Sequence, residues 1–286
     1  MLNNVLLNIK EKKDSLPLSE KKIAELILQE PASIINMNSS SLAQKSGSSP
    51  AAVIRFCHSI GLKGFVDLKL QLSADLQGIN DNLYTEIVPG EELAKIKKKL
   101  LVNTNHVFKE TNNTLADEVV SKATKLFYTS SVIYPFGLGA SSIVAEDFQQ
   151  KFSRIGKKVI FIQDQHALAT SLAVSNSDAL FLGISNGGEK GEVLALTKMA
   201  KSFGLKTISL TRNTKNTLSL TSDVALKTAF AQEPPLRSGA TISLLTQMYA
   251  VDILFYAYVT HYYESSLENL EKSKEAISQL YQQYDL

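Results

Sequence analysis

The stretch that decides the fold is IYPFGLGASSIVAEDF, residues 133–148, in which β-forming residues precede Gly137, Gly139 and a helix-favouring run. A glycine turn between a strand and a helix leaves backbone N–H groups free at the helix N-terminus, where they bind phosphate. The segment therefore predicts a phosphate site in a strand-loop-helix unit. The pyrophosphate of a dinucleotide and a smaller phosphate both remain open as ligands.

From this segment onward, short apolar runs alternate with helix-like stretches. The runs cover residues 132–136, 158–162, 179–184, 206–211 and 223–228, and the helix-like stretches cover 141–155, 167–174 and 189–203. Apolar strands joined by crossover helices predict a parallel sheet that is covered on both faces. Pro135 is unexpected in the first of these strands, because proline removes a hydrogen-bond donor from the ladder.

The pattern of glycines and acids bears on the choice of ligand. A dinucleotide site favours a third glycine at position 142 and an acid about twenty residues later; position 142 is Ser142, and only Asp164 meets the second condition. The run ISNGGEK, residues 184–190, provides a second loop of small, hydroxyl-bearing residues at another strand end. Two such loops favour one compact phosphate that both loops share.

The N-terminal part contains the capping and turn residues that are typical of several short helices. Ser19 is expected to cap a helix that ends before Pro31, and the cluster Ser39 to Ser41 is expected to cap a second helix. Gly47 then supplies a turn, and Ser48 or Ser49 caps a third helix with Pro50 at its first position. Its apolar face is expected to hold Val53, Ile54, Phe56 and Ile60. Two short helices joined by a glycine-containing turn form a helix-turn-helix.

In a helix-turn-helix the second helix enters the major groove with its N-terminal residues toward the bases. The predicted DNA contacts are Lys45, Ser48, Ser49, Ala51, Ala52, Arg55 and Lys63. Arg55 suits a guanine or a phosphate, and Lys63 suits the phosphate backbone. No acid occurs between Glu30 and Asp67 in the sequence, so this segment can approach a polyanion. A small helical bundle that does not bind DNA remains the alternative.

The whole chain has 286 residues and a net charge of +2, which suits about two soluble domains. We expect a helix-turn-helix DNA-binding domain over 1–77, a linker with a connecting helix over 78–105, and the α/β domain over 106–286. One cysteine, Cys57, excludes an internal disulfide framework. The charged N-terminus predicts a cytoplasmic protein. Polar residues interrupt the apolar segment 240–263, which predicts a buried or interface helix and no membrane partner.

Two sets of motifs resemble a known family. The string SLAQKSGSSPAAVIRFCHSIGLKGFVDLKL resembles the helix-turn-helix half of RpiR-family bacterial transcriptional regulators. The motifs GLGASSIVAEDFQQKFSRIGKKV, GISNGGEKGEVL, TISLTRN and EPPLRSGATISLL resemble the sugar isomerase (SIS) domain of that family. The resemblance implies an all-α helix-turn-helix domain followed by an α/β parallel-sheet domain of the SIS, flavodoxin-like or Rossmann-like type.

The resemblance also implies a function and a site. It implies a cytoplasmic homodimer, or a higher homo-oligomer, that binds operator DNA and a phosphorylated sugar effector, with no cofactor and no metal. By motif, Ser141 and Ser185 correspond to phosphate-contacting serines. Gly187 and Lys190 depart from the serine and threonine of the family, so Lys190 either contacts the phosphate as a point charge or projects outward. The expected effector-binding residues are Gly139, Ser141, Ser142, Ser185, Asn186, Gly188, Lys190, His166, Glu233 and Arg237.

An enzyme is the second interpretation. Isomerisation of a sugar phosphate needs a base that moves a proton between neighbouring carbons, and His166 with Glu233 could supply it. The basic helices at the N-terminus have no role in an isomerase, whereas a regulator needs them. We therefore expect a regulator, with an SIS-type isomerase as the alternative.

Overall fold

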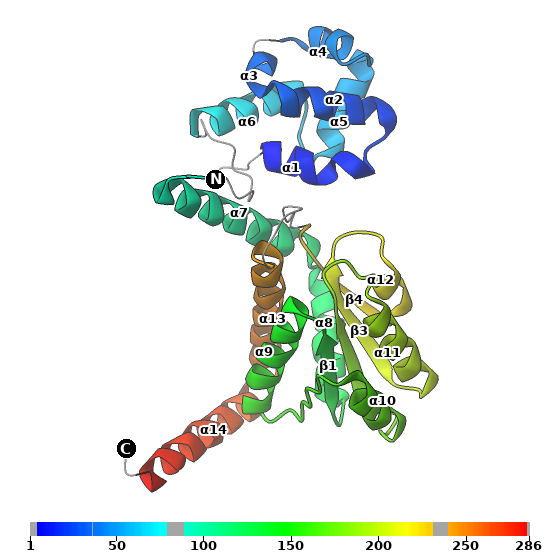
Figure 1. The fold of residues 1–286 in the computed structure, drawn as a ribbon, viewed down its shortest axis with the longest axis vertical. Coiled ribbons are helices and arrows are strands. Elements are labelled where there is room, and N and C mark those ends of the chain that lie inside the picture. The colour runs from blue at the N-terminus through cyan, green and yellow to red at the C-terminus, as the bar shows by residue number, and fades with distance from the viewer. Residues whose placement is uncertain (1–4, 36, 79–88, 231–239, 285–286) are drawn as a thin grey trace. The chain divides into compact units, whose positions relative to one another are not determined.

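The computed structural model describes residues 5–35, 37–78, 89–230 and 240–284, and divides the chain into two compact units. The N-terminal unit comprises residues 1–106 and the C-terminal unit residues 107–286. Figure 1 shows helices alone in the former and a sheet with helices in the latter. The boundary falls inside helix α7, which covers Leu93–Thr114.

The N-terminal unit is a bundle of short helices. Its elements are α1 (Val5–Lys12), the 3-10 turn η1 (Lys13–Ser15), α2 (Leu18–Gln29), α3 (Pro31–Ile34), α4 (Ser39–Lys45), α5 (Pro50–Ser59) and α6 (Phe65–Gly78). One apolar core joins these helices; it includes Ile9, Ile23, Ile27, Phe56 and Leu68. Helix α2 ends before Pro31, as the sequence predicts.

Two predicted helix caps are wrong, and each replacement has a local reason. Pro17 is the N-cap of α2, with φ −56°, so Ser19 is already the second helical residue. Asn38 is the N-cap of α4, because its side-chain oxygen accepts the N–H of Ser41 at 2.8 Å. The serines that follow it are therefore inside the helix.

The C-terminal unit is a four-stranded parallel sheet with helices on both faces. Its strands are β1 (Ile133–Gly137), β2 (Leu180–Ile184), β3 (Lys206–Arg212) and β4 (Val224–Thr228), in the order β1-β2-β3-β4. Its helices are α8 (Asp117–Thr129), α9 (Ala140–Arg154), α10 (Gln165–Ala173), α11 (Gly191–Ser202), α12 (Thr217–Thr221), α13 (Ile242–His261) and α14 (Tyr263–Gln283). The predicted parallel sheet and its three crossover helices are confirmed.

Alternate residues of each strand enter different cores, as a sheet covered on both faces requires. Ile133, Leu180 and Leu182 pack with α8, α9 and α13, whereas Tyr134 and Phe181 pack with α10, α11 and α12. Helix α13 is long and apolar enough, by length and composition alone, to cross a membrane. Its residues Ala250, Val251, Leu254 and Tyr258 lie in the first of these cores, which accounts for the apolar composition.

The predicted strand over residues 158–162 is wrong. This segment makes a single bridge, Ile133 to Val159: the N–H of Ile133 donates to Lys158 and the N–H of Ile160 donates to Ile133. In a parallel ladder alternate residues bond to the same neighbour, so the next donor toward this segment would be the N–H of residue 135. Pro135 has no N–H, and the ladder therefore stops after one bridge. The bonds of β1 to β2 use the intervening residues and are unaffected.

Candidate functional site

The turn between α4 and α5 has the geometry of a helix-turn-helix. Helix α4 ends in a Schellman motif, in which the N–H of Gly47 donates to Gln44 and the N–H of Ser48 donates to Ala43. Gly47 takes φ +61°, which a residue with a Cβ seldom adopts. Ser49 caps α5 by accepting the N–H of Ala52 at 3.2 Å, and Pro50 follows at the first helical position, as the sequence predicts.

Most of the predicted DNA contacts lie on the surface, and one does not. Lys45, Ser49, Ala51, Arg55 and Lys63 are exposed, whereas Ser48 is half-buried. Ala52 is only 1% exposed, so its predicted exposure is wrong. It lies one turn before Phe56 on the face of α5 that packs into the core, and Ile54, which was expected on that face, is exposed instead.

Acids from other helices lie close to the basic residues of the turn. The Nζ of Lys45 lies 2.5 Å from the carboxylate of Glu30, and this bond is the main cause of the lowered pKa of Glu30. The Nε of Arg55 lies 3.8 Å from the carboxylate of Glu20 on α2. The segment that is free of acids in the sequence is therefore not free of them in space.

A cleft of about 600 Å³ lies at the carboxyl edge of the sheet in the C-terminal unit. Ligands of open parallel sheets bind at this edge. The described residues that line it are Leu138, Gly139, Ala140, Ser141, Ile184, Ser185, Asn186, Gly187, Glu189, Lys190, Arg212, Ala240, Ser243 and Gln247. They come from the loops after β1 and β2, the end of β3 and the first half of α13.

Two helices begin at this cleft without a side-chain cap. Gly139, at φ +58°, is the N-cap of α9, and Lys190 is the N-cap of α11; neither makes a side-chain hydrogen bond to the helix. The first N–H groups of a helix carry a partial positive charge, although in α9 those of Ser141 and Ser142 already donate to the carbonyls of Leu138 and Gly139. By contrast, Asp164 caps α10 and Asn216 caps α12 with their own side-chain oxygens. The ends of α9 and α11 are thus suited to an anion.

Hydroxyl groups and cations surround these helix ends. Ser141 and Ser185 are 8% and 4% exposed, and the hydroxyl of Ser141 donates to the side-chain oxygen of Gln247 at 3.3 Å. Lys190 and Arg212 supply positive charge at the rim. The carboxylate of Glu189 accepts the N–H of Thr217 at 2.8 Å, and this bond is the main cause of the lowered pKa of Glu189.

The structure brings together some of the predicted effector-binding residues and separates others. Gly139, Ser141, Ser185, Asn186 and Lys190 line the cleft, whereas Ser142, His166 and Gly188 do not. Glu233 and Arg237 lie outside the described residues.

The three residues that do not line the cleft have local roles. The hydroxyl of Ser142 donates to the carbonyl of Gly139 at 2.7 Å. The side chain of His166 is 88% exposed and lies beside Asp164. Asp164 itself, the acid that a dinucleotide site would use, caps α10 instead. Gly188, at φ +70°, packs so closely on Asn216 that a Cβ would overlap its side chain.

Sequence reasoning missed Arg212, Ser243, Gln247 and Glu189 as cleft residues. Arg212 ends β3, so its position at a carboxyl strand end was the available signal. Gln247 lies inside an apolar helix, 1% exposed, and a buried amide in such a helix calls for a polar partner. Within the described part of the chain, no group of three or more His, Cys, Asp or Glu side chains could hold a metal ion.

Comparison with protein families matches both units. Residues 3–78 match the model described as helix-turn-helix domain, rpiR family, and residues 126–257 match the SIS domain. The chain is 37% identical over 272 residues to a protein named uncharacterized HTH-type transcriptional regulator YbbH from Bacillus subtilis (strain 168), covering 95% of this chain and 96% of YbbH. It is 34% identical to an uncharacterized HTH-type transcriptional regulator from Thermotoga maritima, covering 97% of this chain and 99% of that one.

A solved structure extends the similarity to the fold. The Vibrio vulnificus NanR protein, complexed with ManNAc-6P, aligns with a TM-score of 0.61 at 24% identity, covering 97% of this chain and 99% of NanR. Its similarity supports the order of a helical unit followed by an SIS domain. Together with the near full-length identity to YbbH, these matches show that the chain belongs to the RpiR family of HTH-type transcriptional regulators, with an N-terminal helix-turn-helix domain and a C-terminal SIS domain.

Proposed function

We propose that this regulator binds a phosphorylated hexose or amino sugar in the cleft at the carboxyl edge of its sheet, and that the bound sugar changes its affinity for operator DNA. The observation that carries the proposal is the convergence of two uncapped helix N-termini, two serine hydroxyls and two cations on one cleft. Backbone N–H groups, hydroxyls and a cation bind phosphate without a metal.

The size and walls of the cleft favour a compact ligand. A volume of about 600 Å³ accommodates a phosphorylated monosaccharide. Asp164 caps α10 and does not line the cleft, which weighs against a dinucleotide. ManNAc-6P, which is bound to NanR, is the first candidate to test.

The experiment is a calorimetric and thermal-shift screen over hexose and amino-sugar 6-phosphates, with the unphosphorylated sugars as controls. A ligand at one hundred times its Kd should stabilise the protein by about 2.7 kcal/mol. The proposal would be contradicted if the protein bound none of the sugar phosphates, or if it bound the unphosphorylated sugars equally well. An isomerase would instead convert one of these compounds, so we expect no turnover when products are followed by NMR.

The DNA-binding half of the proposal has a separate test. Gel shifts measure the binding of the protein to the promoter region of its own gene at several salt concentrations. A plot of the logarithm of the binding constant against the logarithm of the salt concentration should have a slope of about −0.9 for each phosphate contact. The effector should change this affinity by about 5- to 150-fold, the usual range of allosteric coupling. We further propose a homodimer that presents two recognition helices to half-sites about one DNA turn apart.

A further inference from the structure

The buried side-chain amide of Gln247, which lines the cleft, has an atom without a partner among the described residues. Gln247 accepts the hydroxyl of Ser141 through Oε1, but its Nε2 is buried and has no hydrogen-bond partner among the described residues. Neighbouring polar residues of α13 differ, since Thr246 donates to the carbonyl of Ile242 at 2.6 Å. An unpaired buried amide nitrogen is rare in folded proteins and asks for an explanation.

The direction of the bond between Ser141 and Gln247 matters for the ligand. When Ser141 donates its proton to Gln247, only lone pairs of its oxygen remain for the cleft, and lone pairs repel an anion. Turning the carboxamide by half a rotation places Nε2 where Oε1 lies, since the two atoms are nearly equal in size. Nε2 then donates to the oxygen of Ser141, whose proton becomes available to a ligand.

We propose that Gln247 is a positioning residue that sets the proton direction of Ser141 and thereby selects an anionic ligand. In the occupied cleft Gln247 donates to Ser141, and Ser141 donates to an anion oxygen. Donors in such a chain polarise one another, which strengthens the final bond. Each orientation leaves one amide atom without a partner among the described residues, and a bound anion favours the orientation in which Gln247 donates to Ser141. This inference rests on the proposed function, because it assigns a role to a residue behind the same cleft.

A double-mutant cycle tests whether Gln247 acts through Ser141. Ser141→Ala, Gln247→Met and the double variant are compared with the full-length protein by calorimetry, with ManNAc-6P and inorganic phosphate as probes. Gln247→Met should weaken binding about fivefold to tenfold in the presence of Ser141, the usual effect of losing one hydrogen bond between neutral groups. It should have less than about twofold effect when Ser141 is already alanine. Equal effects in both backgrounds would overturn the inference.

A second comparison separates positioning from packing. Glutamate keeps the shape of glutamine but adds like charge beside the anion whatever role Gln247 has, so Gln247→Glu is measured both with Ser141 present and with Ser141→Ala. The inference predicts a larger loss with Ser141 present, because a carboxylate can only accept the proton of Ser141. The folded state of each variant is checked by circular dichroism and by DNA binding without ligand.

The outcomes distinguish the two proposals. If the wild-type protein binds neither probe, nor any other sugar phosphate, the proposed function fails and this inference fails with it. If the wild-type protein binds but the cycle is additive, only the role of Gln247 is overturned. If Gln247→Glu does not fold, the cycle with methionine decides alone.

Discussion

Arg212 is a partly buried cation at the cleft. Its guanidinium carbon lies 4.6 Å from the centre of the Phe230 ring, its Nε has no partner among the described residues, and burial lowers its pKa. A charge held against an aromatic ring and shielded from water interacts more strongly with an anion than a free lysine does.

We expect Arg212→Met to weaken ManNAc-6P or inorganic phosphate binding about tenfold or more, because a hydrogen bond to a charged group contributes about 1.5–3 kcal/mol. Calorimetry measures this loss. Lys215→Met removes the same charge from an exposed residue that does not line the cleft, and it serves as the matched control. Equal losses in the two variants would show that Arg212 acts only through net charge.

The residues that sequence analysis placed correctly share a local signature. Ser141 and Ser185 follow strand ends that contain glycine, and Ser49 precedes Pro50. Neighbouring residues in the sequence therefore determine where these serines lie in the structure. Arg212 and Gln247 reach the cleft through the register of β3 and the packing of α13, which depend on distant parts of the chain. Ala52 was misplaced because Ile54 was assigned to the apolar face in its place, although Ala52 lies four residues before Phe56 and therefore shares the face of Phe56.

Among the elements, α1 and α6 are joined by a buried acid. Asp75 on α6 is 2% exposed and accepts the N–H of Leu6 at 3.2 Å. Burial raises the pKa of Asp75 to about 6, although bonds from Leu6 and Val5 and the charge of His106 act in the opposite direction. The folded state therefore binds this proton more tightly than the unfolded state, and stability falls as pH rises from about 4 to about 6.

We expect Asp75→Asn to remove this dependence and to stabilise the N-terminal unit at pH 8 by about 1–3 kcal/mol. Asparagine keeps an acceptor for the N–H of Leu6 without the charge. Hydrogen exchange of α1 at pH 8 and pH 5 measures the change, after correction for the intrinsic exchange rate. Asp14→Asn, an exposed acid of the same unit, is the control. Lower protection of α1 in Asp75→Asn at pH 8 would contradict the expectation.

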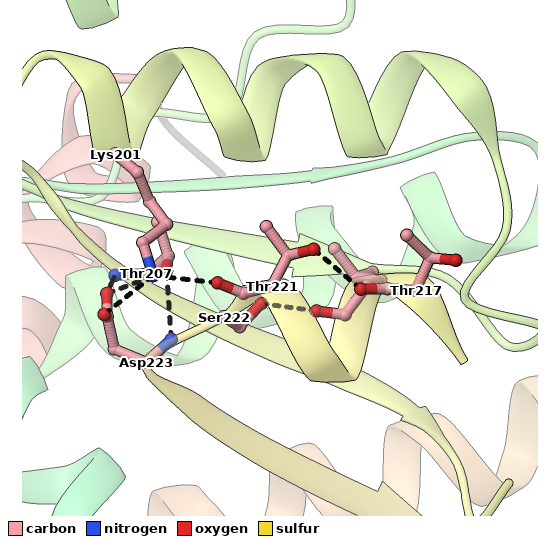
Figure 2. A network of polar contacts seen from close by, with 7 residues as sticks. Lys201, Thr207, Thr217, Thr221, Ser222 and Asp223 are labelled. Carbon is pink, nitrogen blue, oxygen red and sulfur yellow. Dashed lines mark hydrogen bonds and ion pairs between the residues drawn. The ribbon is translucent and has the colours of Figure 1, made fainter. Parts of the chain in front are cut away.

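A polar network ties α11 to β3 and the start of β4. Figure 2 shows Asp223 bonded to both Lys201 and Thr207. One carboxylate oxygen lies 3.0 Å from Lys201 Nζ, and the other accepts the N–H and the hydroxyl of Thr207, each at 2.8 Å. Burial alone would raise the pKa of Asp223, but the bonds from Lys201 and Thr207 outweigh it and lower the pKa. This stabilisation is present above about pH 4 and is lost as pH falls through the folded pKa.

We expect Asp223→Ala to destabilise the C-terminal unit by about 1–3 kcal/mol, because it leaves the N–H of the buried Thr207 without this acceptor. Ser222→Ala is the control, since the hydroxyl of Ser222 donates only to Leu218 in its own helix. Urea denaturation at pH 7 compares the two. The difference between them should shrink at pH 3, and a difference that stays constant would show that the charge of Asp223 is not involved.

The periodicity of the sequence predicted the type and the order of the helices and strands well, and it predicted their first and last residues less well. The four strands and the helices α9, α10 and α11 lie within a few residues of their predicted ranges. The fifth strand failed because apolar composition over 158–162 says nothing about the donors of its neighbour, and Pro135 removes the one that this pairing needs.

At the scale of the whole molecule, we expect the two compact units to perform two separate tasks. We expect Arg55→Ala to weaken operator binding about tenfold while ManNAc-6P binding is unchanged, because Arg55 lies on the exposed face of α5 in the N-terminal unit. Ser141→Ala with Ser185→Ala should abolish the response to ligand while operator binding is retained. Gel shifts with and without ligand measure both variants.

The control for this pair is Lys272→Ala, which removes one positive charge from α14 in the C-terminal unit. It should leave operator and ligand binding as they are. Loss of both activities in both test variants, with the fold intact, would refute the separation of tasks.

The proline in β1 also affects how the protein behaves when it is crowded. Strands at the edge of a sheet recruit strands from other molecules when heat or concentration uncovers them, and this is a route to aggregation. If the segment 158–162 detaches from β1, the uncovered edge lacks a donor at Pro135 and is a poor template for an incoming chain. We therefore expect this edge of the sheet to form intermolecular sheets less readily than an edge strand without proline.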